Sequence, residues 1–191
     1  MAWWGVAFAL GPNYNLPLDA QRNQKALEAV QKAQSRTSDA SDPERQQFDG
    51  TKSKVPADFL FNTNRAHDLL AIAYSVLDAR LAAAAGDRNS AIAQWKRAVD
   101  LQDGLIDDEP PAWYYPLRES LGGEYLRAKR YAEAEKVFRR DLEINPNNAR
   151  SLFGLREALR AQSKNAEAET VNRRFENEWL NADVLISVDT L

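Results

Sequence analysis

The chain has 191 residues, enough for one repeat array with a continuous core or for one domain plus a tail. It has no cysteine, which excludes thiol catalysis, disulfides and cysteine-based zinc or iron–sulfur sites, and its single histidine, His67, excludes a histidine-rich metal site. The net charge of −3 comes from basic residues spread among acidic ones, a pattern that argues against nucleic acid as a partner.

Residues 1–36 predict a divergent N-terminal helix pair. Residues 1–10 are apolar but lack a preceding basic region, and they are far short of the roughly 20 residues that span a bilayer, so we read them as a buried helix. The second helix would follow Asp19 and carry Ala26, Val30 and Ala33 on one face. We therefore expect a soluble, cytoplasmic chain with no membrane partner, although a periplasmic protein that had lost its signal peptide would have the same sequence.

Residues 37–62 predict a polar linker, because they offer few apolar side chains to bury. Pro43 suits the first position of a short helix, which could hardly pass Phe48 before Asp49 and Gly50 interrupt it.

Residues 63–182 predict an array of helix pairs. The first helix has apolar residues at helical spacing for about five turns, and Gly86 with Asp87 ends it; these residues are Ala66, Leu69, Leu70, Ala73, Leu77, Leu81 and Ala84. The returning helix repeats a small, large, small spacing at Ala91, Trp95 and Ala98. Leu77 and Leu81 lie one residue out of the register counted back from Ala91, which predicts an extra residue in the turn.

The clearest pattern runs over residues 115–146. Gly122 lets a second helix approach closely, Tyr125 fills the wedge between the helices, and Ala134 and Phe138 are the small and large members of the facing stripe. Pro146 stops that helix, because proline cannot continue it.

A last pair is predicted after Asn147 and Asn148, with Asn165 as the cap of its second helix. Its apolar residues are Leu152, Leu155, Leu159, Ala168, Val171, Phe175 and Trp179, and its large position holds Asn172 instead. Apolar and polar residues alternate over a short run in residues 183–191, which predicts an edge segment or a tail.

The order of Gly122, Tyr125, Ala134, Phe138 and Pro146 resembles one tetratricopeptide (TPR) unit of about 34 residues. The chain also resembles the C-terminal part of longer bacterial TPR proteins that have no agreed activity. The resemblance implies an all-α fold, a right-handed superhelical array of antiparallel helix pairs, and binding on its concave face.

Counting from Leu121 and Leu155, the concave groove should be lined by Glu119, Gly123, Arg127, Arg150, Phe153, Glu157 and Arg160. Arg127, Arg150 and Arg160 could hold an acidic or C-terminal carboxylate partner, and solvated helix faces explain them equally well. The lysine–asparagine clamp of chaperone-binding relatives is not reproduced, since Gly123 and Glu157 occupy the asparagine-like positions.

The loop of residues 107–115 offers a second kind of site. Trp113, Tyr114 and Tyr115 could form a platform for a peptide or small ligand, or could wedge a long connection onto its neighbours. The acidic residues 107–109 lack the spacing of a calcium loop and read as a solvated turn.

From these patterns we expect a non-catalytic interaction scaffold that binds a protein or peptide in its groove, with no cofactor and no metal. An alternative is a small-ligand-binding or enzyme-accessory domain built on the loop of residues 107–115. The polar stretch before residue 57 would also leave an end face that favours self-association, or would mark the chain as a shortened repeat fragment.

Overall fold

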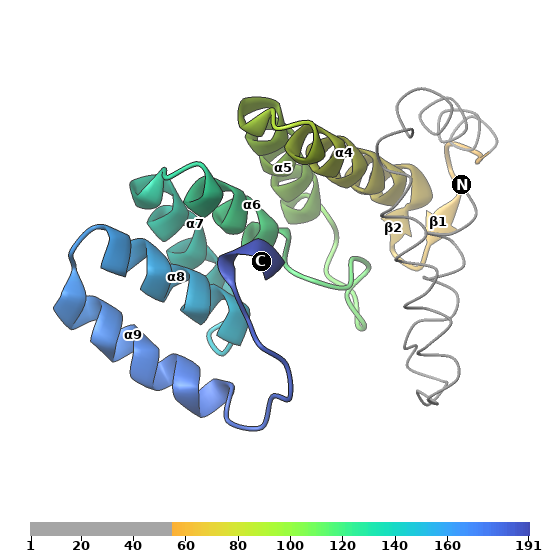
Figure 1. The fold of residues 1–191 in the computed structure, drawn as a ribbon. Coiled ribbons are helices and arrows are strands. Elements are labelled where there is room, and N and C mark those ends of the chain that lie inside the picture. The colour runs from red at the N-terminus through yellow and green to blue at the C-terminus, as the bar shows by residue number, and fades with distance from the viewer. Residues whose placement is uncertain (1–54) are drawn as a thin grey trace. The chain divides into compact units, whose positions relative to one another are not determined.

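A computed structural model describes residues 55–191, of which Ala57–Leu191 form one compact unit. The helix pair predicted in residues 1–36 and the short helix predicted after Asp42 lie outside the described residues. The unit contains six α-helices, two very short strands and a 3₁₀ turn (Figure 1). Their bounds are β1 (Leu60–Phe61), β2 (Asn64–Arg65), α4 (Ala66–Ala84), α5 (Arg88–Asp103), α6 (Leu117–Arg127), α7 (Tyr131–Ile144), α8 (Ala149–Ala161), α9 (Asn165–Glu178) and η2 (Val188–Thr190). The all-α class is confirmed for this part of the chain.

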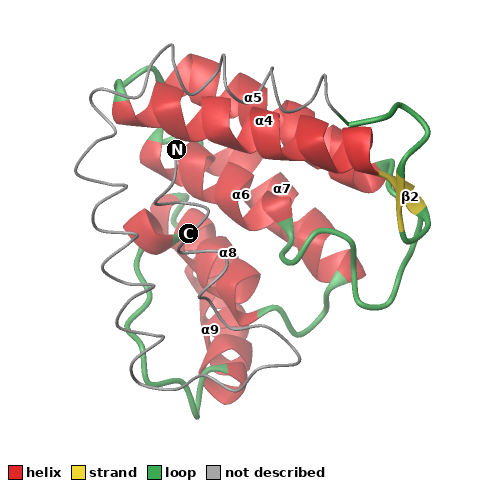
Figure 2. Cartoon of the chain, turned by 90° about the vertical axis from the view of Figure 1, so that its right-hand side faces the viewer, coloured by secondary structure: helices red, strands yellow, loops and turns green. Residues whose placement is uncertain are grey.

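The six helices form three consecutive hairpins, α4–α5, α6–α7 and α8–α9 (Figure 2). Each hairpin has a three-residue turn whose middle residue has a positive φ: Gly86 at 79°, Lys129 at 58° and Ser163 at 60°. The same backbone hydrogen bonds recur, because the residue after each of these donates to a carbonyl five residues before it. The three turns are therefore one geometry used three times, with spacings of 43 and 34 residues.

The structure corrects two predictions about these turns. The first turn has no extra residue, since the buried positions of α4 are Ile72, Ser75, Val76 and Ala79 and not the stripe that includes Leu77 and Leu81. Asn165 does not cap α9 either: Lys164 is the N-cap residue, and no side chain caps that end. In contrast, Asn148 does cap α8, accepting hydrogen bonds from the Arg150 and Ser151 amides.

Phe138 of α7 is the centre of the packing between α6, α7 and α8. Its ring is fully buried, and a Cβ added to Gly122 of α6 would lie 2.4 Å from Phe138 Cζ. A Cβ added to Gly154 of α8 would lie 2.2 Å from the same atom. Two helices can therefore close on one aromatic ring because both present glycine to it.

The positions equivalent to Gly122 and Phe138 are filled differently in the other hairpins. Counting from the positive-φ residues, they are Ala79 and Trp95 in the first hairpin, both buried. In the last hairpin they are Arg156 and Asn172, joined by a 2.8 Å hydrogen bond from Arg156 Nη1 to Asn172 Oδ1. Asn172, which was predicted to depart from the pattern, therefore has a polar partner, Arg156, at the matching position of α8.

Residues 104–116 connect the first hairpin to the second and are held by side chains. Asn64 is only 3% exposed; its amide donates to the Ile106 carbonyl at 2.9 Å and accepts from the Ile106 amide at 2.8 Å. At the other end, Gln102 donates to the Tyr115 carbonyl and accepts from the Leu117 amide. Asn64 belongs to the β1–β2 hairpin, which the sequence patterns did not predict.

None of the helices within residues 55–191 is both long enough and apolar enough to cross a bilayer.

Candidate functional site

Residues 186–191 return from the end of α9 to the surface of α6, where η2 packs (Figure 1). Arg127 Nη1 of α6 donates to the Val188 carbonyl oxygen at 2.7 Å, and Arg150 of α8 donates to the Thr190 carbonyl oxygen. Leu191 is 9% exposed, and a Cβ added to Gly123 would lie 2.7 Å from its Cβ. We call this surface, formed by Glu119, Gly123, Arg127 and Arg150, the α6–α8 face.

Both arginines of the α6–α8 face are oriented by buried carboxylates. Arg150 Nε donates to Glu119 Oε2 at 2.6 Å, and Arg127 Nε donates to Glu124 Oε2 at 3.1 Å. Glu119 is 5% exposed and Glu124 only 1%. Because each guanidinium is held on one side, its remaining N–H groups present a fixed pattern of donors.

Glu119 lies in a polar network that joins α6 to the start of α8. Asn148 Nδ2 donates to Glu119 Oε1 at 2.9 Å and to Asp141 Oδ2 at 2.7 Å, and Ser151 Oγ donates to Asp141 at 2.6 Å. Burial raises the pKa of Glu119 above its ordinary value; hydrogen bonds from Asn148 and Arg150 oppose the rise, and the Asp141 charge adds to it. The network therefore fixes the position of Glu119, and through it the position of Arg150.

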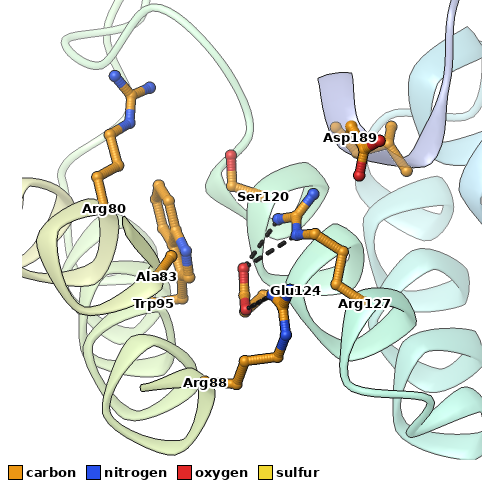
Figure 3. Close-up of a pocket in the computed structure, with 9 residues that line it drawn as sticks. Arg80, Ala83, Arg88, Trp95, Ser120, Glu124, Arg127 and Asp189 are labelled. Atoms are coloured by element: carbon orange, nitrogen blue, oxygen red, sulfur yellow. Dashed lines mark hydrogen bonds and ion pairs between the residues drawn. The ribbon is translucent and has the colours of Figure 1, made fainter. Parts of the chain in front are cut away.

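A cavity of about 290 Å³ lies beside the same segment (Figure 3). Its lining comes from α4, α5, α6 and residues 186–191: Arg80, Ala83, Arg88, Trp95, Ser120, Glu124, Arg127, Asp189 and Leu191. Arg88 Nη1 donates to Glu124 Oε1 at 2.7 Å, so the buried carboxylate joins α5 to α6. Three arginines and two carboxylates line the cavity, and Asp189 supplies one of those carboxylates from the segment itself.

The structure divides the residues predicted for the groove. Arg127 and Arg150 come together with Glu119 and Gly123 around residues 186–191. Phe153 lies in the core at 6% exposure, with its ring 5.7 Å from that of Phe175.

Glu157 and Arg160 lie farther along α8 and pair with each other at 3.3 Å, and Glu157 also accepts from Arg156 Nε at 2.8 Å. Within the described residues, neither Glu157 nor Arg160 forms a hydrogen bond with residues 186–191. The predicted groove residues therefore form two separate groups.

The aromatic loop has one exposed and two half-buried rings. Tyr114 is 69% exposed and lies 4.7 Å from the Tyr115 ring, while Trp113 and Tyr115 pack partly against the core. Trp113 Nε1, Tyr115 Oη and Asp108 Oδ2 are buried atoms without a hydrogen-bond partner. Within residues 55–191, no group of three or more His, Asp or Glu residues could hold a metal ion, and the acidic residues 107–109 are included in that statement.

The sequence patterns missed the segment of residues 186–191 as an occupant of the α6–α8 face, and missed Arg88 and Glu124 beside it. Alternating Ile186 and Val188 were a signal of partial burial, but they gave no indication of which surface would cover them.

The chain matches no model of a known protein family and no curated protein.

Proposed function

We propose that this chain is a non-catalytic interaction scaffold of the TPR type, a right-handed array of helix hairpins that binds a segment of a partner protein on its concave surface. The repeated turn at Gly86, Lys129 and Ser163 supports the repeat interpretation, because one turn geometry recurs with the same hydrogen bonds. The spacing of 34 residues between the last two turns, and the glycine positions that admit Phe138, support it further.

The observation that carries the proposal is the chemistry of the α6–α8 face. Arg127 and Arg150 donate to backbone carbonyl oxygens, and Gly123 leaves a hollow that an aliphatic side chain fills. Backbone acceptors and one apolar anchor are what an arbitrary peptide segment offers, so the face suits peptide binding better than catalysis. It includes no nucleophile placed beside a general base.

The test is selection of a random peptide library on the full chain, followed by affinity measurements on the enriched peptides. Gly123→Leu is the informative variant, since its side chain would occupy the hollow and, besides Leu191, would crowd the flexible end of Arg127. We expect enriched peptides that bind the wild type and lose at least tenfold in affinity on Gly123→Leu. Gly104→Ala, which lies outside the residues of this face and would place its Cβ an ordinary 3.5 Å from the nearest atom, is the matched control. No enrichment, or binding that ignores Gly123→Leu, would contradict the proposal.

A second candidate is a small-ligand site in the loop of residues 107–115. The buried, unpartnered Trp113 Nε1 and Tyr115 Oη favour it, because a ligand could satisfy them. Trp113→Phe removes the indole N–H and keeps a ring of similar character. A small molecule found by ligand screening that binds the wild type and not Trp113→Phe would support this candidate, and retention by the variant would contradict it.

A further inference from the structure

Residues 186–191 bind the α6–α8 face through contacts that a different polypeptide could also make. Within the segment, the two arginines donate hydrogen bonds to the backbone carbonyl oxygens of Val188 and Thr190, which every peptide has. The side chains add selectivity: Leu191 covers Gly123, Ile186 and Val188 pack partly against the core, and Asp189 lines the cavity that three arginines also line. The face therefore favours aliphatic side chains on either side of an acidic one.

The connection before this segment is weakly held. Residues 180–185 are all exposed, with Leu180 at 77% and Leu185 at 98%. A side-chain hydrogen bond holds this connection to the end of α9, from Trp179 Nε1 to the Val184 carbonyl oxygen at 3.2 Å. Few contacts must break for the segment to leave while α9 stays in place, so release does not require unfolding of the hairpins.

The hollow at Gly123 is filled by Leu191 of the segment, whose Cβ is the atom nearest to an added Cβ. The next nearest atoms belong to the flexible end of the Arg127 side chain, at 3.3 Å and 3.4 Å. A glycine in the middle of a helix costs about 0.5–1 kcal/mol relative to alanine. At Gly122 the packing of Phe138 offsets this cost, and at Gly123 the packing of Leu191 offsets it.

We propose that residues 186–191 are a built-in ligand that masks the α6–α8 face, and that the partner is a peptide segment of the same chemistry, acidic and aliphatic, which displaces them. This inference rests on the proposed function and adds the class of partner and its regulation by competition. A tethered segment acts at an effective concentration on the order of millimolar, so a partner must exceed this internal competitor to bind.

The test uses a fluorescent peptide with the sequence of residues 183–191, amidated at its end, and the full chain. In Leu191→Lys the new ammonium group would face Arg127, which releases the chain's own segment and leaves the face intact. We expect the peptide to bind Leu191→Lys at least tenfold more tightly than wild type, measured by fluorescence anisotropy. Adding Gly123→Leu to Leu191→Lys should abolish the binding, and a peptide with lysine in place of Val188 and Leu191 should not bind.

A second measurement needs no substitution. With ¹⁵N-labelled wild type and unlabelled peptide, only the chain's own amides are observed, and those of residues 186–191 should shift toward unbound positions as peptide is added. Equal peptide affinity for wild type and Leu191→Lys, or amide signals that do not change at millimolar peptide, would overturn the inference.

The two proposals fail in different ways. If library-selected peptides bind wild type and Leu191→Lys equally well, the masking inference is wrong and the scaffold function stands. If no library peptide binds either protein while the peptide of residues 183–191 binds Leu191→Lys, the face serves only its own segment and the scaffold function is wrong.

Discussion

The junction between α6–α7 and α8–α9 differs from the junction between α4–α5 and α6–α7. In the former the turns are 34 residues apart, the connection spans residues 145–148, and α6 packs directly on α8 around Phe138. In the latter the spacing is 43 residues, and all of the difference lies in the longer connection of residues 104–116. The cavity lined by Arg88, Trp95 and Glu124 lies between α5 and α6, at the junction with the longer connection, but none of its lining residues belongs to residues 104–116.

The two junctions are also held together by different interactions. The regular junction, with the 34-residue spacing, is closed by the Phe138 ring between two glycines, and the network of Glu119, Asn148 and Asp141 joins the same helices. The irregular junction, with the 43-residue spacing, is linked by polar groups: Arg88 with the buried Glu124, and Asn64 and Gln102 with loop backbone atoms. Truncation at the first should cost stability of the whole unit, whereas truncation at the second should loosen one loop.

Phe138→Ala should have the largest effect. Because the ring is fully buried between Gly122 and Gly154, its removal leaves a closed cavity and should lower the free energy of unfolding by about 3–5 kcal/mol. Urea denaturation followed by circular dichroism measures it. Tyr114→Ala, at an exposed ring of the loop, is the control and should change stability by less than about 0.5 kcal/mol. Similar losses in the two variants would refute the central position of Phe138.

Gly122→Ala should destabilise the same junction by about 1–3 kcal/mol, since its Cβ would overlap the Phe138 ring. The variant Gly104→Ala has no such overlap and should be close to neutral. Thermal melts of the two variants, compared with wild type, measure the difference. A stabilised Gly122→Ala would show that the α6–α7 distance is looser than described.

Asn64→Ala should act on the irregular junction. It removes both hydrogen bonds to Ile106 and leaves a backbone N–H and C=O without partners, a loss of about 1–3 kcal/mol for each group that stays buried. Hydrogen exchange should accelerate in residues 104–116 and remain unchanged at Phe138. Uniform acceleration throughout α6–α9 would mean that the two junctions unfold as one unit.

Glu135→Gln should have the smallest effect and a defined pH dependence. Partial burial raises the pKa of Glu135, but hydrogen bonds from Lys164, Gln162 and Arg139 outweigh it and lower the pKa from 4.5 to about 2. A lowered carboxyl pKa stabilises the fold above pH 4.5, and that contribution is lost as the pH falls toward 2. The cationic partners Arg139 and Lys164 are well exposed to solvent, at 44% and 41%, so we expect Glu135→Gln to lose less than about 1 kcal/mol at pH 7.

Urea titrations at pH 7, 4.5 and 3 measure this difference, which should shrink as the pH falls. Glu169→Gln, on the exposed side of α9, is the matched control and should show no such trend. A difference that grows on acidification would contradict the sign of the pKa shift.

The helices between residues 66 and 178 could be predicted from the sequence because their determinants are local. Asn148 and Pro146 act on the chain within a few residues, and the Ala134–Phe138 spacing is a property of one helix. The face of α4 could not be predicted so well, because Leu69, Leu77 and Leu81 are as apolar as Ile72 and Val76. Only packing against α5 decided which of these became buried.

The candidate site was predictable in part for the same reason. Helical periodicity placed Arg127 and Arg150 on one surface, but their contact with Val188 and Thr190 joins residues 61 and 40 positions apart. No local pattern encodes such a separation. The Gly123 hollow was equally hidden, because a glycine beside Gly122 reads as part of the same packing motif until Leu191 is seen against it.

The central claim, that the α6–α8 face is a peptide site closed by the chain's own segment, is tested most directly by removing that segment. A chain shortened to end at Leu185 lacks residues 186–191 and keeps Gly123, Arg127 and Arg150 of the face. The affinity of the residue 183–191 peptide is then measured for the shortened chain and for the wild type. The account predicts at least tenfold tighter binding to the shortened chain; equal affinity for the two proteins, or no binding to a folded shortened chain, would contradict it.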